Sequence, residues 1–459
     1  MRFYFIEFTY LLAGILFILG LKGLSHPETA KRGMHLAEFG MLMAIVGTLL
    51  HFSIVSYELI ITGLVIGGLI GGAMAYWVPM TAMPQRTALS HAFGAFAAAL
   101  VGIAEYMRHG AELGGVKMAA INFEVMLGSL TTTGSLMAFA KLQGMTRGTP
   151  MTFRGQNVFN MALLAAVVGL FFYTLVEPGA AAAFYVMIGL AFLFGVMLVL
   201  PIGSADMPVV MSLLNSYAGL AAAATGFVLD NKVLIIAGTL DGFSGLILSI
   251  LMCRAMNRSL TNVLFGAFGS ESAAAGAGTG EEGHMREVGP EDVAIQLAYA
   301  KQVVFVPGYG MATAQAQHAV RELAGVLEER GVSVKYAIHP VAGRMPGHMN
   351  VLLAEANVPY SSLYELEQIN PEFPQTDVAV VIGANDVVNP DARDNPQSPI
   401  AGMPILEVDR AHSVIVLKRG KGKGFSGLEN PLFFKPVTGM LYGDAKDSLI
   451  KLTQAVQQA

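Results

Sequence analysis

The stretch Val303-Val304-Phe305-Val306-Pro307-Gly308-Tyr309-Gly310-Met311 decides the fold of the C-terminal part of the chain. Its apolar residues 303–306 predict a short buried strand, and Gly308-x-Gly310 follows that strand and opens a predicted helix. A glycine turn at this place lets the backbone approach a pyrophosphate, whose negative charge faces the start of the helix. Thr313 occupies the third fingerprint position, where Gly or Ala is usual, so a plain tight turn is the alternative.

Strands alternate with helices from residue 290 to the end of the chain. The further predicted strands are 332–338, 378–382, 404–408 and 414–418. The predicted helices are 311–330, which ends at Gly331, and 445–456. This alternation predicts that 290–459 is a Rossmann-like α/β domain, a doubly wound parallel sheet covered by helices on both faces.

The second predicted strand indicates which dinucleotide fits. NAD-binding folds usually carry Asp or Glu at the end of this strand, where the acid binds the ribose hydroxyls. Here Lys335-Tyr336-Ala337-Ile338-His339 offers no carboxylate. The later strand ends in the basic loop 418–424, which suits a 2′-phosphate. Together these features favour NADP, although a solvated basic loop is the alternative for 418–424.

The first part of the chain reads as a polytopic membrane domain. Of 459 residues, 54% are hydrophobic and 13% are charged, whereas soluble proteins carry about 25% charged residues. A spanning helix needs about 20 mostly apolar residues, and nine stretches qualify: 4–21, 34–50, 57–76, 87–106, 119–140, 156–174, 179–199, 207–227 and 233–252. The net charge of −5 argues against a nucleic-acid partner, and the single Cys253 excludes a disulfide framework within the chain.

The loops predict the topology and the domain boundaries. Lys and Arg favour cytoplasmic loops, and their distribution places the N-terminus outside and the C-terminal domain in the cytoplasm. The runs Gly67–Gly72 and Ala221–Ala224 predict close packing between helices. The tract 259–289, rich in Gly, Ala, Ser and Glu, predicts a flexible tether. The expected domains are therefore 1–258, a linker 259–289, and 290–459.

Polar residues inside predicted spans are candidates for a proton path, because burying them in a membrane is costly. His91 lies one turn inside the fourth span, and a histidine binds and releases a proton near neutral pH. Asn215 lies midway along the eighth span and can hydrogen-bond and order water. The alternatives are a satisfied interfacial histidine and an interhelical hydrogen bond. Further candidates are Glu124 and Asp241, which have no assigned step, and Asp206, which can cap a helix; His35, His51 and His109 lie near span ends and are interpreted as interfacial.

Four motifs in this order make the chain resemble one family, the beta subunits of proton-translocating NAD(P) transhydrogenase. They are Pro307–Ala312, Ile338–Asn350, Gly383–Asp386 and Asn430–Lys435, and the resemblance extends over essentially the whole chain. It implies that the domain holds NADP(H) in an orientation reversed from most Rossmann proteins. It also implies that His91 and Asn215 serve proton translocation.

The resemblance implies a set of cofactor-binding residues. Arg344 would face phosphate oxygens, Lys418 and Arg419 the 2′-phosphate, and Asp386 the nicotinamide side, where the residues alone predict only a turn. The full set is Gly308, Tyr309, Gly310, Val341, Ala342, Gly343, Arg344, Met345, Pro346, Gly383, Ala384, Asn385, Asp386, Val387, Gly402, Met403, Lys418, Arg419, Gly420, Lys421, Gly422, Lys423, Gly424, Phe425, Asp444 and Ala445.

The expected activity is hydride transfer coupled to proton movement. Hydride passes directly between two nicotinamide rings, so neither a nucleophile nor a metal is needed. This chain has one dinucleotide fold, so NAD(H) would be carried by a transhydrogenase alpha subunit, in a dimer of the whole complex. The expected location is a bacterial inner membrane, with the N-terminus periplasmic. Two rivals are a channel or transporter gated by a nucleotide-sensing domain, and a structural membrane anchor for a dehydrogenase.

Overall fold

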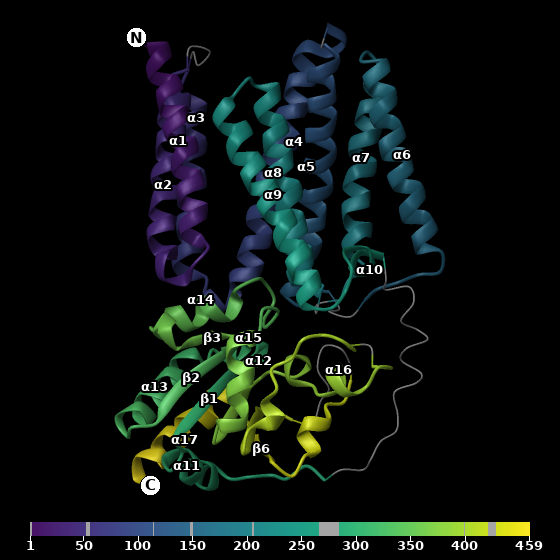
Figure 1. Ribbon diagram of the computed structural model, residues 1–459. Helices are drawn as coiled ribbons and strands as arrows, with labels where there is room; N and C mark the ends of the chain where they lie inside the picture. Colours follow the sequence, from purple (N-terminus) through teal and green to yellow (C-terminus); the bar gives the residue numbers. More distant parts are fainter. Residues whose placement is uncertain are drawn as a thin grey trace.

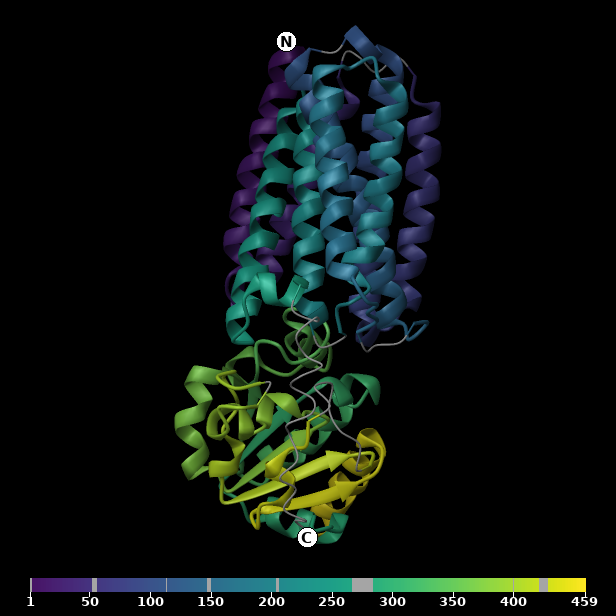
Figure 2. The same cartoon turned by 90° about the vertical axis from the view of Figure 1, so that its right-hand side faces the viewer.

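The protein consists of a bundle of long helices followed by an α/β domain at one end of the bundle (Figures 1 and 2). The structure is a computed structural model, and it describes residues 2–51, 56–112, 114–146, 150–203, 206–265, 284–398, 400–420 and 428–459. The N-terminus lies at the end of the bundle that points away from the α/β domain (Figure 1).

Long helices coincide with the nine predicted apolar stretches. Within the described ranges they are α1 (Arg2–Leu24), α2 (Pro27–Leu49), α3 (Glu58–Trp77), α4 (Met83–His109), α5 (Gly115–Leu142), α6 (Gln156–Val176), α7 (Ala181–Val199), α8 (Met207–Val228) and α9 (Lys232–Ala255). The short 3-10 turn η1 (Met80–Ala82) precedes α4, and α10 (Leu260–Phe265) follows α9.

The number of spans needs a correction. Judged by length and composition, seven helices in the described part of the chain can cross a membrane, and α2 and α5 are not among them. The first turns of α2 carry Glu28, Lys31 and Arg32. Helix α5 packs between α4, α7 and α8 and buries Asn122 and Glu124, so these two polar residues are shielded by protein. The length and apolar character of a stretch alone did not separate such helices from lipid-facing ones.

Small residues bring α8 and α9 together, as their abundance predicted. A Cβ atom on Gly219 would lie 2.8 Å from the Cα atom of Gly242, so only glycine allows this approach. The run Gly67–Gly72 differs. Among the described residues, none outside α3 lies within 4 Å of the place where a Cβ would stand on Gly67, Gly68, Gly71 or Gly72.

The described residues of the α/β domain form a six-stranded sheet in which neighbouring strands pair in parallel. The strand order is β3-β2-β1-β4-β5-β6, that of the doubly wound dinucleotide-binding fold. The strands are β1 (Gln302–Pro307), β2 (Ser333–Ile338), β3 (Leu363–Glu365), β4 (Val378–Ile382), β5 (Ser413–Lys418) and β6 (Thr438–Tyr442). The helices are α11 (Pro290–Ala298), α12 (Tyr309–Thr313), α13 (Gln317–Glu329), α14 (His348–Glu355), α15 (Leu366–Ile369), α16 (Asp391–Asp394) and α17 (Ala445–Gln458). The predicted fold class is confirmed.

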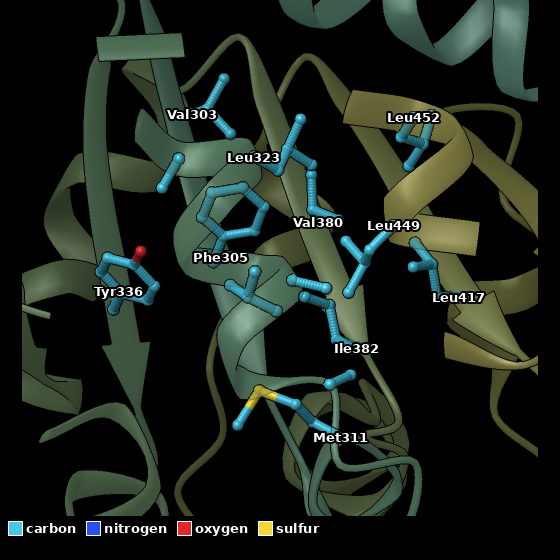
Figure 3. Close-up of a cluster of buried hydrophobic side chains, with 14 of the residues drawn as sticks. Val303, Phe305, Met311, Leu323, Tyr336, Val380, Ile382, Leu417, Leu449 and Leu452 are labelled. Atoms are coloured by element: carbon cyan, nitrogen blue, oxygen red, sulfur yellow. The ribbon is translucent and has the colours of Figure 1, made fainter. Parts of the chain in front are cut away.

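Alternating side chains of the strands build one core on each face of the sheet. Val303 and Phe305 of β1 point to one core, and Val304 and Val306 point to the other. In the first core Leu323 of α13 and Leu449 of α17 pack on the strands (Figure 3). Fully burying one such leucine contributes about 1.5–3 kcal/mol. Both faces are covered, so the strands read as continuous apolar runs.

Two predictions for this domain are wrong. Segment 404–408 is not a strand, because its backbone is hydrogen-bonded elsewhere: the Leu406 amide donates to Val387 O (2.9 Å), and the Asn370 side chain donates to Ile405 O (2.9 Å). The predicted helix 311–330 is two helices, because Gln315 takes a left-handed conformation with φ 50° between them.

Two strands were missed because their signals are weak. β3 has only three residues, and β6 contains Gly439. The predicted tether 259–289 stays a prediction. Residues 266–283 lie outside the described residues, and the described ends hold α10 and a bridge from Glu287 to Met440.

Candidate nucleotide site and membrane cluster

Two glycine turns interlock at the carboxyl ends of β1 and β4, where the strand order reverses. The Gly308 amide donates to Ile382 O and the Gly310 amide to Gly383 O, both at 2.9 Å. A Cβ on Gly308 would stand 2.5 Å from the Cα of Ala384, and one on Gly310 would stand 2.6 Å from the Cα of Gly383. These glycines are therefore required by the contact between the turns. Ligands of open α/β sheets bind at this crevice.

The loop after β2 is held by two buried histidines that the sequence did not single out as site residues. His339 Nδ1 accepts from the Val341 amide (3.2 Å), so its Nε2 carries the proton and donates to Pro404 O (2.8 Å). Burial lowers the pKa of His339 to about 4. His348 Nδ1 accepts from the Arg344 amide (3.2 Å), and burial likewise lowers its pKa to about 4. Both imidazoles are neutral at pH 7 and fix the loop by direct hydrogen bonds.

This same loop contacts the membrane domain through Arg344. Its guanidinium lies 4.1 Å from the centre of the Tyr309 ring, and Nη1 donates to Leu142 O (2.8 Å), the last residue of α5. Burial lowers the pKa of Arg344. Val341 packs against a cluster that includes Val209 and Met252 of α8 and α9. Two predicted cofactor residues, Tyr309 and Arg344, thus contact each other, and Arg344 also contacts the bundle.

Other contacts from the bundle reach the same edge of the domain. The Asn257 side chain donates to Ala401 O (3.0 Å), next to the predicted residue Gly402, whose φ is +76°. Met80 of η1 packs against the core of the α/β domain. A cavity of about 590 Å³ lies beside Gly402 and Met403. In Figure 1 the helix α14 lies directly below the lower ends of the bundle helices.

The turn after β4 is fixed by a residue that the prediction omitted from the site. Asn430 Nδ2 donates to both Asn385 O (3.0 Å) and Asn385 Oδ1 (3.1 Å), while its Oδ1 accepts from the Leu432 amide. Asp386 opens a 3-10 turn and acts electrostatically on Lys418 at the end of β5. Burial lowers the pKa of Lys418, and its Nζ lies 4.5 Å from the centre of the Phe433 ring.

The remaining predicted cofactor residues lie at the same carboxyl edge. Asp444 caps α17, because its Oδ1 accepts from the amides of Lys446 (3.0 Å) and Asp447 (3.4 Å). Arg419 and Gly420 follow β5 directly. Lys421, Gly422, Lys423, Gly424 and Phe425 lie outside the described residues.

In the bundle, the two predicted proton-path residues lie in one cluster. His91 of α4 hydrogen-bonds Asn215 of α8, and Asn215 Nδ2 donates to Asp241 Oδ1 of α9 (3.0 Å). His91 Nδ1 is buried and has no hydrogen-bond partner among the described residues. Asn215 thus makes an interhelical hydrogen bond, the alternative considered for it, and it also lies beside His91.

Comparison with known proteins places this arrangement in a family. A family model described as the NAD(P) transhydrogenase beta subunit matches residues 6–455. The chain belongs to this family. It is also 50% identical, over 98% of both chains, to NAD(P) transhydrogenase subunit beta of Rhodospirillum rubrum, and a second sequence of that subunit, from a named strain of this species, matches equally. The resemblance inferred from the four motifs is confirmed, and the chain is a membrane-protein subunit of an oxidoreductase complex that uses nicotinamide nucleotides.

The end of β2 in the transhydrogenase domain carries no carboxylate. The residue that follows β2 is His339, and the Val341 amide and Pro404 O occupy both of its ring nitrogens. The position where NAD-binding folds hold an acid therefore has none. At the end of β5, Lys418 and Arg419 offer positive charge.

Three other polar groups in the transhydrogenase bundle have defined partners. Glu124 accepts from Thr225 Oγ1 (2.6 Å). Asp206 stands at the N-cap position of α8, but its side chain caps no amide; instead it pairs with Arg258 (2.7 Å). Lys141, which was not predicted, is buried and donates to the carbonyl oxygens of Val199, Leu200 and Ile202.

The histidines near span ends are mostly paired at the surface. His35 lies 3.0 Å from Glu38 and His109 lies 3.2 Å from Glu105, and both side chains are exposed. Sequence spacing would have found both pairs, since they are three and four residues apart on one helix.

Proposed function

We propose that this chain is the NADP(H)-binding and proton-translocating subunit of the transhydrogenase complex. It would take part in hydride transfer from NADH, held by an alpha subunit, to NADP⁺, coupled to inward proton movement. Residues 290–459 would hold NADP(H) and residues 1–258 would form the proton path, joined by the linker 259–289. The full complex would be a dimer in a bacterial inner membrane, with the N-terminus periplasmic and the nucleotide domain cytoplasmic.

Different residues of this chain would bind different parts of NADP(H). Gly308, Gly310 and Gly383 bring two turns close enough for backbone amides to face a pyrophosphate. Arg344 would bind phosphate oxygens, and Lys418 and Arg419 the 2′-phosphate, because guanidinium groups make bidentate bonds to phosphate. Bound NADP⁺ accepts the hydride at its nicotinamide ring. Asp386, in the turn after β4, would position that ring.

One observation carries the coupling: Arg344, assigned to phosphate oxygens, donates to Leu142 O at the end of α5. A guanidinium has five N–H donors, so this side chain could bind phosphate oxygens and the carbonyl oxygen together. A bound nucleotide would then contact the bundle through Arg344. Helix α5 also packs on α4, which carries His91. Protonation near His91 and nucleotide binding would thereby bias one docking equilibrium, which is the requirement for coupling between sites.

The test uses vesicles that contain this chain and its alpha partner. Reduction of NADP⁺ by NADH should accelerate when a proton gradient is imposed from the periplasmic side. His91→Ala should abolish this acceleration and leave NADP⁺ binding intact. Gradient-driven reduction that survives His91→Ala would remove His91 from the path. NADP⁺ binding without hydride transfer would instead favour the nucleotide-sensing channel.

A further inference from the structure

Asp241 lies near the middle of α9, at a depth in the membrane where a carboxylate is costly. It is nine residues after Lys232 and fourteen before Ala255 in α9, so at 1.5 Å per residue it stands about 14 Å and about 21 Å from the two helix ends. The hydrocarbon core of a bilayer is about 30 Å thick. Ionisable residues at this depth pair with one another or line a path for water or ions.

The partners of Asp241 are residues of the proposed proton path. Asn215 Nδ2 donates to Asp241 Oδ1 at 3.0 Å, and Asn215 also hydrogen-bonds His91. Asp241 and His91 act on each other electrostatically. The amide therefore holds a carboxylate and an imidazole at a fixed separation, on three adjacent helices. An amide does not titrate, so charge changes remain on the two outer groups.

Four other titratable groups on the packed helices have partners outside this cluster. Glu124 of α5 accepts from Thr225. Lys141 of α5 binds carbonyl oxygens at the end of α7. On α1, which packs on α9, Glu7 pairs with Lys232 at 2.8 Å. Besides these, the neighbouring helices carry Lys117 of α5, paired with Asp230 (3.0 Å), Tyr217 of α8, and Tyr4, Tyr10 and Lys22 of α1. Asp241 is the electrostatic partner of His91.

Asp241 differs from a buried structural ion pair because its side chain is exposed. Its side chain is exposed on the surface of the bundle, whereas His91 and Asn215 are partly buried. A carboxylate that served only as an acceptor for Asn215 would gain nothing from its charge, because an amide or hydroxyl oxygen accepts equally well. A charged group beside a titrating histidine, however, decides how strongly the imidazole holds its proton.

We infer that Asp241 is the counter-ion of the proton-binding cluster formed by His91, Asn215 and Asp241. A ring nitrogen of His91 takes one proton from water on one side and becomes an imidazolium. The Asp241 carboxylate keeps its charge, so the pair becomes neutral, and Asn215 holds both groups in place. The proton then leaves to water on the other side, and the neutral imidazole returns. Asp241 is thus a positioning and electrostatic residue that acts through His91.

This inference rests on the proposed function, and its test separates the two. In vesicles with the complete complex, gradient-driven reduction of NADP⁺ by NADH is measured across a range of pH. Asp241→Asn keeps the shape and an acceptor oxygen for Asn215 but removes the charge. Its pH profile should move to lower pH by about one unit, because the imidazolium loses a neighbouring opposite charge. Asp241→Glu should restore the wild-type profile.

Glu7→Gln is the matched control, since it removes one carboxylate charge from the helix beside α9 and should leave the profile in place. A profile of Asp241→Asn that coincides with wild type, while His91→Ala abolishes coupling, overturns the inference and spares the proposed function. Coupling that survives His91→Ala overturns both. If Asp241→Asn does not accumulate, Asp241→Ser is the second neutral variant. The pH dependence of His91 acylation by a histidine reagent then gives the same shift without turnover.

Discussion

Gly308→Ala tests whether the two interlocked turns build the nucleotide site. The new methyl group would stand 2.5 Å from the Cα and amide nitrogen of Ala384 and 2.5 Å from Gly383 O. All three are backbone atoms, so no side-chain rotation relieves the contact. The turns must separate by about 1 Å to reach an ordinary carbon–carbon distance.

The expected cost follows from the contacts that this separation breaks. The hydrogen bonds Gly308 N to Ile382 O and Gly310 N to Gly383 O are both 2.9 Å long. Each contributes about 1 kcal/mol, and overpacking adds about 1–3 kcal/mol. The local destabilisation is therefore about 3–5 kcal/mol, and amide exchange in β1 and β4 should accelerate by at least ~100-fold. NADP⁺ binding should be lost with it.

The assay is hydrogen exchange by mass spectrometry on the full chain, together with NADP⁺ binding. Gly325→Ala is the matched control, because Gly325 lies in α13 and no atom of the described residues outside that helix lies within 4 Å of its new methyl group. It should stabilise α13 by about 0.5–1 kcal/mol and leave binding unchanged. Wild-type exchange rates and affinity in Gly308→Ala would refute the interlocked turns as the origin of the site.

Three further predictions follow from single contacts. Because the folded pKa values of His339 and His348 are about 4 and imidazoles of the unfolded chain titrate near 6.5, the unfolded state binds more protons as pH falls through that window. Domain stability should therefore decrease from about pH 6.5 to about pH 4, by about 2 kcal/mol per histidine at about pH 5; unfolding curves that do not change over this window would contradict it. Lys141→Met should destabilise the bundle by about 2–4 kcal/mol, because it leaves the carbonyl oxygens of Val199, Leu200 and Ile202 without their donor. The measurement is the melting temperature in detergent. Lys117→Met is the control and should change this temperature little, because Lys117 forms an exposed pair with Asp230. Met80→Asp should weaken the docking of the nucleotide domain on the bundle without weakening NADP⁺ binding, because Met80 packs on the core of that domain. Limited proteolysis at the linker should then be faster. An unchanged cleavage rate would speak against the contact.

Helices and strands that coincide with long apolar stretches could be predicted from the sequence. Segments whose structure depends on contacts with distant residues could not. The apolar repeats of the bundle and the buried runs of β1, β4 and β5 report their structure directly. Segment 404–408 has the same apolar character as a strand, yet the Asn370 side chain and Val387 O take its backbone bonds. The sequence of 404–408 does not show that its hydrogen-bond partners are Asn370 and Val387, which lie outside the segment.

The candidate site divides in the same way. The glycines around Gly308 and Gly383 are visible as motifs, and the structure adds a reason for them that the motifs do not contain: the two turns touch each other. The imidazole of His339 acts through Pro404 O, 65 residues away, and Asn430 acts through Asn385, 45 residues away. Motif reading finds residues that touch a ligand, and it overlooks residues that hold such a loop in place.

The contact between Arg344 and Leu142 joins residues 202 positions apart, and neither residue marks it in the sequence. If Arg344 binds a phosphate as proposed, its other N–H groups can stay on the carbonyl end of α5, because a guanidinium has five N–H donors. One side chain would then contact the nucleotide and the bundle together, so a change in either contact would alter the other. Coupling between two sites requires that both bias one equilibrium, and under the proposal this contact is where that equilibrium is to be measured.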